Sequence, residues 1–217
     1  MLVTLTPNLS FKLVFSLAVS LLLIYGIQNN ASAQTRAEQD LLIMSESGGD
    51  VITFESLLKS GANPNALDSI DNTPLINASI HNRADFVRLL LKYGADINLV
   101  SLSKQTPLMY AASRGNIEVM ELLINDGANM DLRSNLGFTA LINAIMNEKL
   151  AAVKLLIAKN ADLNIKTEQG ISAIGYAREK NNEEIEALLL EAGADPNIYS
   201  DFALSNAALE GDIEQVK

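Results

Sequence analysis

A period of 33 residues is the feature that most constrains this chain. Strings of the Gly-Ala-Asp type recur at this spacing and begin at Gly61, Gly94, Gly127, Asn160 and Gly193. Strings of the Thr-Pro-Leu type keep the same spacing in a second register and begin at Thr73, Thr106, Thr139 and Ser172. Because the two registers agree, the sequence predicts a tandem array of short structural units. The predicted units are residues 34–66, 67–99, 100–132, 133–165 and 166–198.

Each unit carries the signals for two helices. Pro74 and Pro107 suit the first turn of a helix, where a missing amide hydrogen costs nothing, and the threonine before each can cap the free amides. Gly115 and Asn82 suit the left-handed backbone that separates two helices, whereas Glu148 in the same register is a poorer choice. The leucine-rich segments that follow cannot be buried within one helix pair, so we expect the units to stack.

With these features, the chain resembles the ankyrin-repeat proteins. Their pattern combines a turn, Thr-Pro-Leu-His-x-Ala-Ala, a glycine break, a leucine-rich helix and Gly-Ala-Asp-x-Asn, and most of its positions are matched over residues 34–198. The resemblance implies an all-α repeat solenoid, in which stacked helix-turn-helix units are joined by short hairpin-like turns. It also implies a non-enzymatic protein-binding role.

One position departs from the family pattern. The histidine that commonly follows Thr-Pro-Leu in the family is replaced here by Ile76, Met109, Ile142 and Gly175. A net hydrogen bond contributes about 1 kcal/mol, and a buried isoleucine or methionine contributes about 2 kcal/mol. We therefore expect packing to replace a polar network in this column.

The residue content gives little support to catalysis. Cysteine is absent and His81 is the single histidine, so thiolate and multi-histidine metal sites cannot form within the chain. Glu183 and Glu184 begin a predicted helix, where acids interact favourably with the helix dipole. The net charge of -10 disfavours nucleic-acid and anionic-membrane partners. We expect no enzyme activity, no metal, no cofactor and no nucleic-acid partner.

The first 33 residues have the pattern of a signal peptide. Lys12 precedes an apolar run from Leu13 to Ile27, and the small residues Ala31, Ser32 and Ala33 follow. The alternative is an uncleaved membrane anchor, but the run is shorter than the roughly 20 residues that span a bilayer. Cleavage after Ala33 is expected, which would leave a bacterial periplasmic or secreted protein with no stable membrane anchor.

A stack of repeats offers a long concave face for a protein partner. The ends of the first helices and the turns before Thr-Pro are expected to point to this face. The candidate partner-binding residues are Ile70, Ile80, His81, Leu102, Ser113, Arg114, Leu136, Phe138, Ile145, Met146, Ile171, Arg178 and Glu179. The alternative for the apolar turn residues is packing between neighbouring turns. We expect Phe138 and Met146 to be exposed anchors and Leu155 to lie in the stacked leucine core.

Residues 199–217 are similar to the start of a further, incomplete repeat. Two hypotheses about function follow from the whole pattern. In the first, an exported, monomeric ankyrin-repeat protein binds one protein partner and inhibits or protects it. In the second, the repeats are the substrate-docking arm of a longer enzyme or receptor whose active domain lies beyond Lys217.

Overall fold

The computed structural model describes residues 35–196, in which the regular secondary structure is helical apart from an isolated bridge at Ile171. The predicted all-α repeat fold is confirmed. The helices form five consecutive pairs: residues 35–47 with α2 (Val51–Lys59), α3 (Pro74–Ile80) with α4 (Ala84–Lys92), α5 (Pro107–Arg114) with α6 (Ile117–Asn125), α7 (Ala140–Met146) with α8 (Leu150–Ala158), and α9 (Ala173–Glu179) with α10 (Glu183–Glu191). The predicted signal peptide (1–33) and incomplete repeat (199–217) lie outside the described residues, and the unit boundaries remain a prediction.

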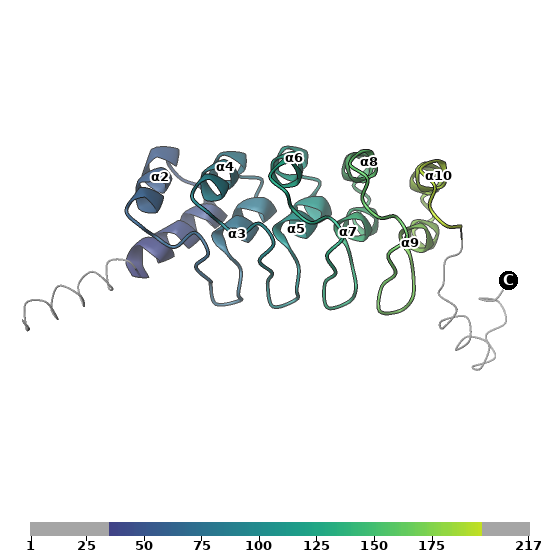
Figure 1. Ribbon diagram of the computed structural model, residues 1–217, viewed down its shortest axis with the longest axis horizontal. Coiled ribbons are helices and arrows are strands. Elements are labelled where there is room, and N and C mark those ends of the chain that lie inside the picture. The colour runs from purple at the N-terminus through teal and green to yellow at the C-terminus, as the bar shows by residue number, and fades with distance from the viewer. Residues whose placement is uncertain (1–34, 197–217) are drawn as a thin grey trace, which may run out of the picture.

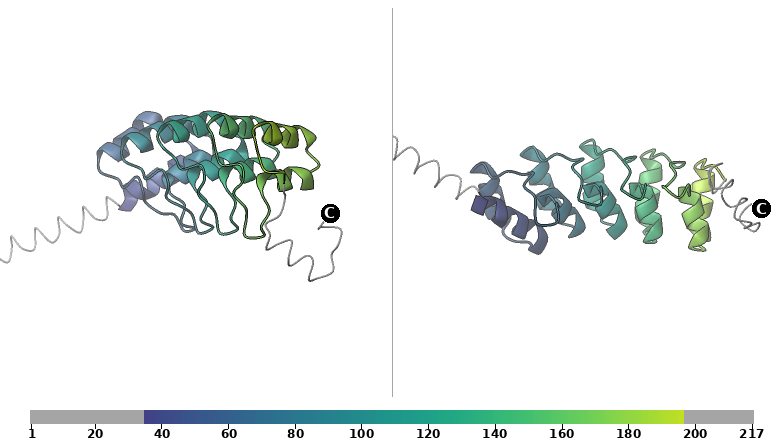
Figure 2. Two further views of the ribbon diagram at one scale, coloured as in Figure 1. Left: turned by 45° about the vertical axis from the view of Figure 1, so that its right-hand side comes forward. Right: turned by 90° about the horizontal axis from the view of Figure 1, so that it is seen from below.

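The helices form two layers with a row of hairpin turns beside them (Figure 1). The second helices of the pairs form one layer, which consists of α2, α4, α6, α8 and α10, and the first helices form the other. From α3 on, each first helix packs on the first helix of the next unit, and from α2 on, each second helix does the same in its own layer. The hairpins at residues 67–72, 100–105, 133–138 and 166–171 project from the first-helix layer on the same side, as the left view of Figure 2 also shows.

The first helices begin where the sequence predicts. The hydroxyl oxygens of Thr73, Thr106 and Thr139 accept hydrogen bonds of 3.2 to 3.3 Å from the backbone N–H three residues later. Such a cap satisfies one of the amides left free at a helix start. The Oγ atom of Ser172, in the fourth of these positions, is buried and has no hydrogen-bond partner.

The break between the two helices of a pair lies in the left-handed region of backbone conformation. Gly115 has a φ of 75° there, as predicted for a glycine at a helix end. Asn82 and Glu148 adopt the same conformation with φ values of 54° and 55°. Glu148 therefore holds a conformation that disfavours its Cβ, and the surrounding stack maintains it.

The core confirms the predicted exchange of a histidine column for packing. Ile76, Met109 and Ile142 are all buried, and the sulfur of Met109 accepts a hydrogen bond of 3.4 Å from the N–H of Thr106. The prediction that Leu155 lies in the stacked leucine core is confirmed in part, because Leu155 packs against the core cluster. Leu155 is half-buried, and its neighbour Leu156 is the fully buried side chain, because that face of α8 is turned toward the first-helix layer.

A ladder of side-chain hydrogen bonds joins consecutive units. In each rung, a side-chain Oδ1 atom accepts from a backbone N–H of the next unit at 2.8 to 3.0 Å. The rungs are Asp96 N–H to Asn65, Asn129 N–H to Asn98, Asp162 N–H to Asp131, and Asp195 N–H to Asn164. The Gly-Ala-Asp-x-Asn pattern thus has a direct structural role, because its last residue fixes the distance to the next unit.

Gly137 lies where the third hairpin approaches the fourth, so a substitution at this position tests how close that approach is. Its φ is 78°, and a Cβ added there would lie 2.7 Å from the backbone N of Glu168 and 2.8 Å from the Cα of Thr167. We expect Gly137→Ala to lower the free energy of unfolding by about 1–2 kcal/mol through backbone conformation and by about 1–3 kcal/mol more through the clash. Urea unfolding followed by circular dichroism measures the loss.

Gly127→Ala is the matched control for this prediction. Gly127 has a φ of 93°, and a Cβ there would meet no atom within 4 Å. Its substitution should cost only the conformational part. Equal losses in the two variants would show that the hairpins are not in close contact.

Candidate functional site

Hydrogen bonds hold each hairpin in a fixed conformation. Each one is closed by a backbone hydrogen bond across its tip, as in Asp68 N–H to the carbonyl of Asn72 at 3.0 Å and Ser134 N–H to the carbonyl of Phe138 at 3.0 Å. Side chains of the first helix in the same unit also form hydrogen bonds with the hairpin. The hydroxyls of Tyr110 and Ser101 lie 3.1 Å apart, and the side chain of Asn77 donates to Asp68 at 3.3 Å.

Large apolar side chains are exposed along the hairpins. We call them the apolar hairpin surface, which consists of Leu67, Ile70, Val100, Leu102 and Leu136. The two most exposed are Leu102 at 65% and Leu136 at 61%. A row of exposed apolar side chains on a rigid scaffold is typical of a protein-binding surface.

The turn residues predicted from the sequence divide into two groups. Ile70, Leu102 and Leu136 are exposed on the apolar hairpin surface. Phe138 and Ile171 are half-buried and pack against the core. The ring of Phe138 meets the ring of Tyr176 edge to face, with centroids 5.5 Å apart. Phe138 and Ile171 are therefore packing residues, and the ring contact of Phe138 is with helix α9 of the next unit rather than with a neighbouring turn.

The fourth unit does not carry the exposed anchors that were predicted there. Ile145 is fully buried, which excludes the predicted contact with a partner. Met146 is half-buried against the core, and Phe138 is held by Tyr176. These side chains face inward because α7 packs between α5 and α9, which leaves its apolar residues facing neighbouring helices.

The predicted residues at the ends of the first helices have several different environments. Ile80 and Ser113 are half-buried, whereas His81, Arg114 and Glu179 are exposed. Arg178 is committed to the fold, because its guanidinium donates to Glu186 at 2.7 Å and to the carbonyl of Pro196 at 2.9 Å. The predicted residues at the ends of the first helices and those of the hairpins are spread along one long face of the array. They do not form a compact cluster.

Leu67 and Val100 belong to the surface but were not predicted. They lie 33 residues apart, and the equivalent positions in the next two hairpins are Arg133 and Lys166. This position is apolar in the first two hairpins and charged in the later two, and this difference was the signal in the sequence that could have identified Leu67 and Val100. The apolar hairpin surface is therefore concentrated over the N-terminal half of the array.

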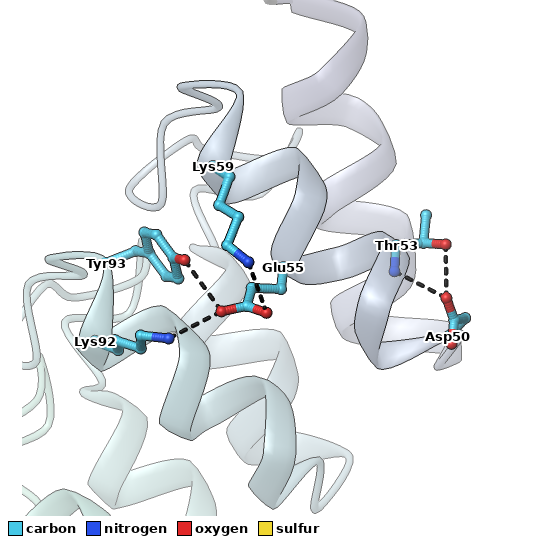
Figure 3. Close-up of polar contacts among 6 residues, drawn as sticks. All are labelled: Asp50, Thr53, Glu55, Lys59, Lys92 and Tyr93. Carbon is cyan, nitrogen blue, oxygen red and sulfur yellow. Dashed lines mark hydrogen bonds and ion pairs between the residues drawn. The ribbon is translucent and has the colours of Figure 1, made fainter.

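Charged groups pair across units in the second-helix layer. Glu55 accepts hydrogen bonds from Lys92 at 2.9 Å and Tyr93 at 3.1 Å, and forms an ion pair with Lys59 at 3.2 Å (Figure 3). These donors, Lys92 first and then Lys59 and Tyr93, lower the pKa of Glu55 from its usual 4.5 to about 2. An ion pair between Lys154 and Glu184 joins a later pair of units in the same layer. The charges of this layer therefore support the stack.

The described part of the chain gives no arrangement suited to metal chemistry. No group of three or more histidine, cysteine, aspartate or glutamate side chains in residues 35–196 is placed to hold a metal ion. The helices of the same part are too short or too polar to cross a bilayer.

The comparisons with known proteins agree with the repeat fold. A family model described as ankyrin repeats (3 copies) matches residues 16–101, 41–134, 108–200 and 141–217. Its overlapping matches together span most of the sequence. No curated protein matches the chain.

The Glu55 cluster predicts a pH dependence of stability. A carboxylate whose pKa is depressed by folding contributes stability that is present above its unfolded value of 4.5 and is lost as the pH falls toward 2. The difference in unfolding free energy between the parent and Glu55→Gln should therefore be constant above about pH 5 and shrink below it. Urea titrations at a series of pH values measure this difference.

Tyr93→Phe is the control, because it removes one of the three donors and should leave part of the effect. A difference between parent and Glu55→Gln that does not change with pH would contradict the role of the cluster.

Proposed function

The chain belongs to the ankyrin-repeat family, whose repeats generally mediate protein–protein interaction, and we propose that it is an exported, non-enzymatic protein that binds one protein partner. The partner is placed on the concave face, with the apolar hairpin surface as the main contact. This proposal rests on one observation above the others: the side chains of Leu102 and Leu136 remain largely exposed to solvent in the stacked array. Central apolar anchors of this kind supply much of the energy of protein interfaces.

The proposed location is a bacterial periplasm or the outside of the cell. Its support is the signal-peptide pattern of residues 1–33 in the sequence. A monomer that inhibits or protects a periplasmic or secreted protein fits this location, because a repeat array offers a surface and no chemistry of its own.

Site-specific photo-crosslinking tests the function directly. The full-length chain carries a photoreactive residue at Leu102, or at Glu121 in the second-helix layer as the control, and is mixed with periplasmic extract. A discrete crosslinked species should form from position 102 and not from position 121. Crosslinking from both positions, or from neither, would count against the proposed face.

Substitutions separate binding from packing. Replacing Leu102 and Leu136 together by lysine should reduce the free energy of binding the captured partner by about 2 kcal/mol or more. The melting temperature should stay nearly unchanged, because both side chains are exposed. Replacing Phe138 and Met146 together by lysine should instead lower the melting temperature, because both side chains pack against the core. Isothermal titration with the captured partner and thermal denaturation give the two readouts. If the Leu102 and Leu136 variant binds as well as the parent, the partner uses another face.

A further inference from the structure

The first unit lacks the hairpin that the other units have. In the 33-residue register, Asp40 occupies the position of Thr73, yet residues 35–47 form one continuous helix through that position. Helix therefore replaces both the hairpin and the capped helix start. Within residues 35–196, no hairpin covers this end of the first-helix layer.

The missing hairpin exposes a position that is buried elsewhere. Ile43 is equivalent in register to Ile76, but Ile43 is 60% exposed and Ile76 is 0% exposed. Within a complete unit, the side chain of this column folds back onto the end of its own hairpin, as the bond from Thr106 N–H to the sulfur of Met109 shows. Ile43 has no such hairpin end to pack on.

A groove occupies this place. It has a volume of ≈ 360 Å³ and lies between the helix of residues 35–47 and the first hairpin, with Leu42, Ile43, Leu67 and Ser69 among its lining residues. A second groove of ≈ 440 Å³ shares Leu42 and Leu67 and continues toward Asn63. The two grooves adjoin through these shared residues, and an extended chain is the kind of ligand that can lie along an exposed hairpin.

The groove also contains a backbone donor in a defined register. Where later hairpins lie side by side, Asn135 N–H donates to the carbonyl of Ser103 at 3.0 Å, and Glu168 N–H donates to the carbonyl of Leu136 at 3.1 Å. The equivalent donor of the first hairpin is the N–H of Ser69, which has no partner among the described residues. The same bond is not formed between the first and second hairpins, so Leu102 N–H is also unpaired there.

The rim of the groove is acidic. Glu46 and Asp68 line the first groove and Glu38 lines the second, and none of the described lining residues of either groove is basic. Asp68 also accepts hydrogen bonds within the hairpin and from Asn77. A ligand with lysine or arginine beside an apolar residue is therefore complementary in charge and in polarity.

We propose that an extended, basic segment of the protein partner docks in the place of the missing hairpin. One carbonyl of this segment accepts the hydrogen bond from Ser69 N–H, an apolar side chain packs on Ile43 and Leu67, and flanking basic side chains face Glu46 and Glu38. The inference rests on the proposed function, since it names the chemistry of part of the partner.

Fluorescence anisotropy with a synthetic probe tests the site. The probe is a fluorescein-labelled peptide of about nine residues in which valine or isoleucine alternates with lysine or arginine, so that one face of the strand is apolar. The full chain should bind this peptide, and should bind the version with glutamate in place of the basic residues at least about tenfold more weakly. Equal binding of the two peptides would overturn the proposal.

A matched pair of variants locates the binding. Leu67→Lys should weaken binding of the basic peptide about tenfold or more, because it places a cation in the groove. Ile52→Lys makes a similar change at an exposed apolar position of α2, outside both grooves and outside the apolar hairpin surface, and should change the affinity less than about twofold. Thermal denaturation confirms that both variants are folded. Equal effects of the two substitutions would overturn the proposal.

Two other occupants are separate outcomes of the same experiment. If the peptide binds a chain that begins at Gln34 but not the full chain, the N-terminal segment of the protein itself fills the groove and the proposal is wrong. If sedimentation shows a dimer that the peptide dissociates, a second copy fills the groove, and the proposal is again wrong. Crosslinking from Leu102 that persists when the peptide fails to bind would remove this inference alone and leave the proposed function standing.

Discussion

The stacking of each helix pair on the next is the interaction on which the rest of the structure depends. Leu90, Leu123, Leu156 and Leu189 repeat at 33-residue intervals, and each is fully buried. A single pair of short helices has no interior in which to bury such a side chain, so burial requires a neighbouring unit. The ladder from Asn65 to Asp195 adds directional bonds to this apolar packing. The spacing of the hairpins is therefore a consequence of the core.

Because the buried residues already hold the units together, the residues of the two outer faces can differ in chemical character. The second-helix layer uses its charges within the stack, as in the Glu55 cluster and the ion pair between Arg88 and Glu118 at 2.9 Å. The hairpin face instead leaves apolar side chains largely exposed, among them Leu102 at 65% and Leu136 at 61%. Surface ion pairs contribute little stability each, whereas an exposed leucine gains free energy when a partner covers it. Binding energy is thus available on the hairpin face.

The sequence was sufficient for features that depend on local backbone chemistry. Helix starts at Thr73 and Thr106 and the left-handed Gly115 follow from the residue itself and its neighbours. The sequence was not sufficient for the direction of individual side chains. Leu155 and Leu156 differ by one position, and the rotation of α8 decides which of them is buried. Phe138 was misassigned because its contact, Tyr176, lies in the next unit, and no local pattern marks that approach.

The hairpins also differ in how strongly they are held to one another. The third and fourth are joined by the bond between Glu168 and Leu136, by an ion pair of 2.7 Å between Arg133 and Glu168, and by the close approach at Gly137. The first and second hairpins have no hydrogen bond or ion pair between them, and they carry Leu67, Ile70, Val100 and Leu102. The free backbone donors and the exposed apolar area therefore coincide at the N-terminal half. A protein bound there would supply both kinds of contact that the neighbouring units provide for the later hairpins, which is why the strongest binding is expected over the first three hairpins.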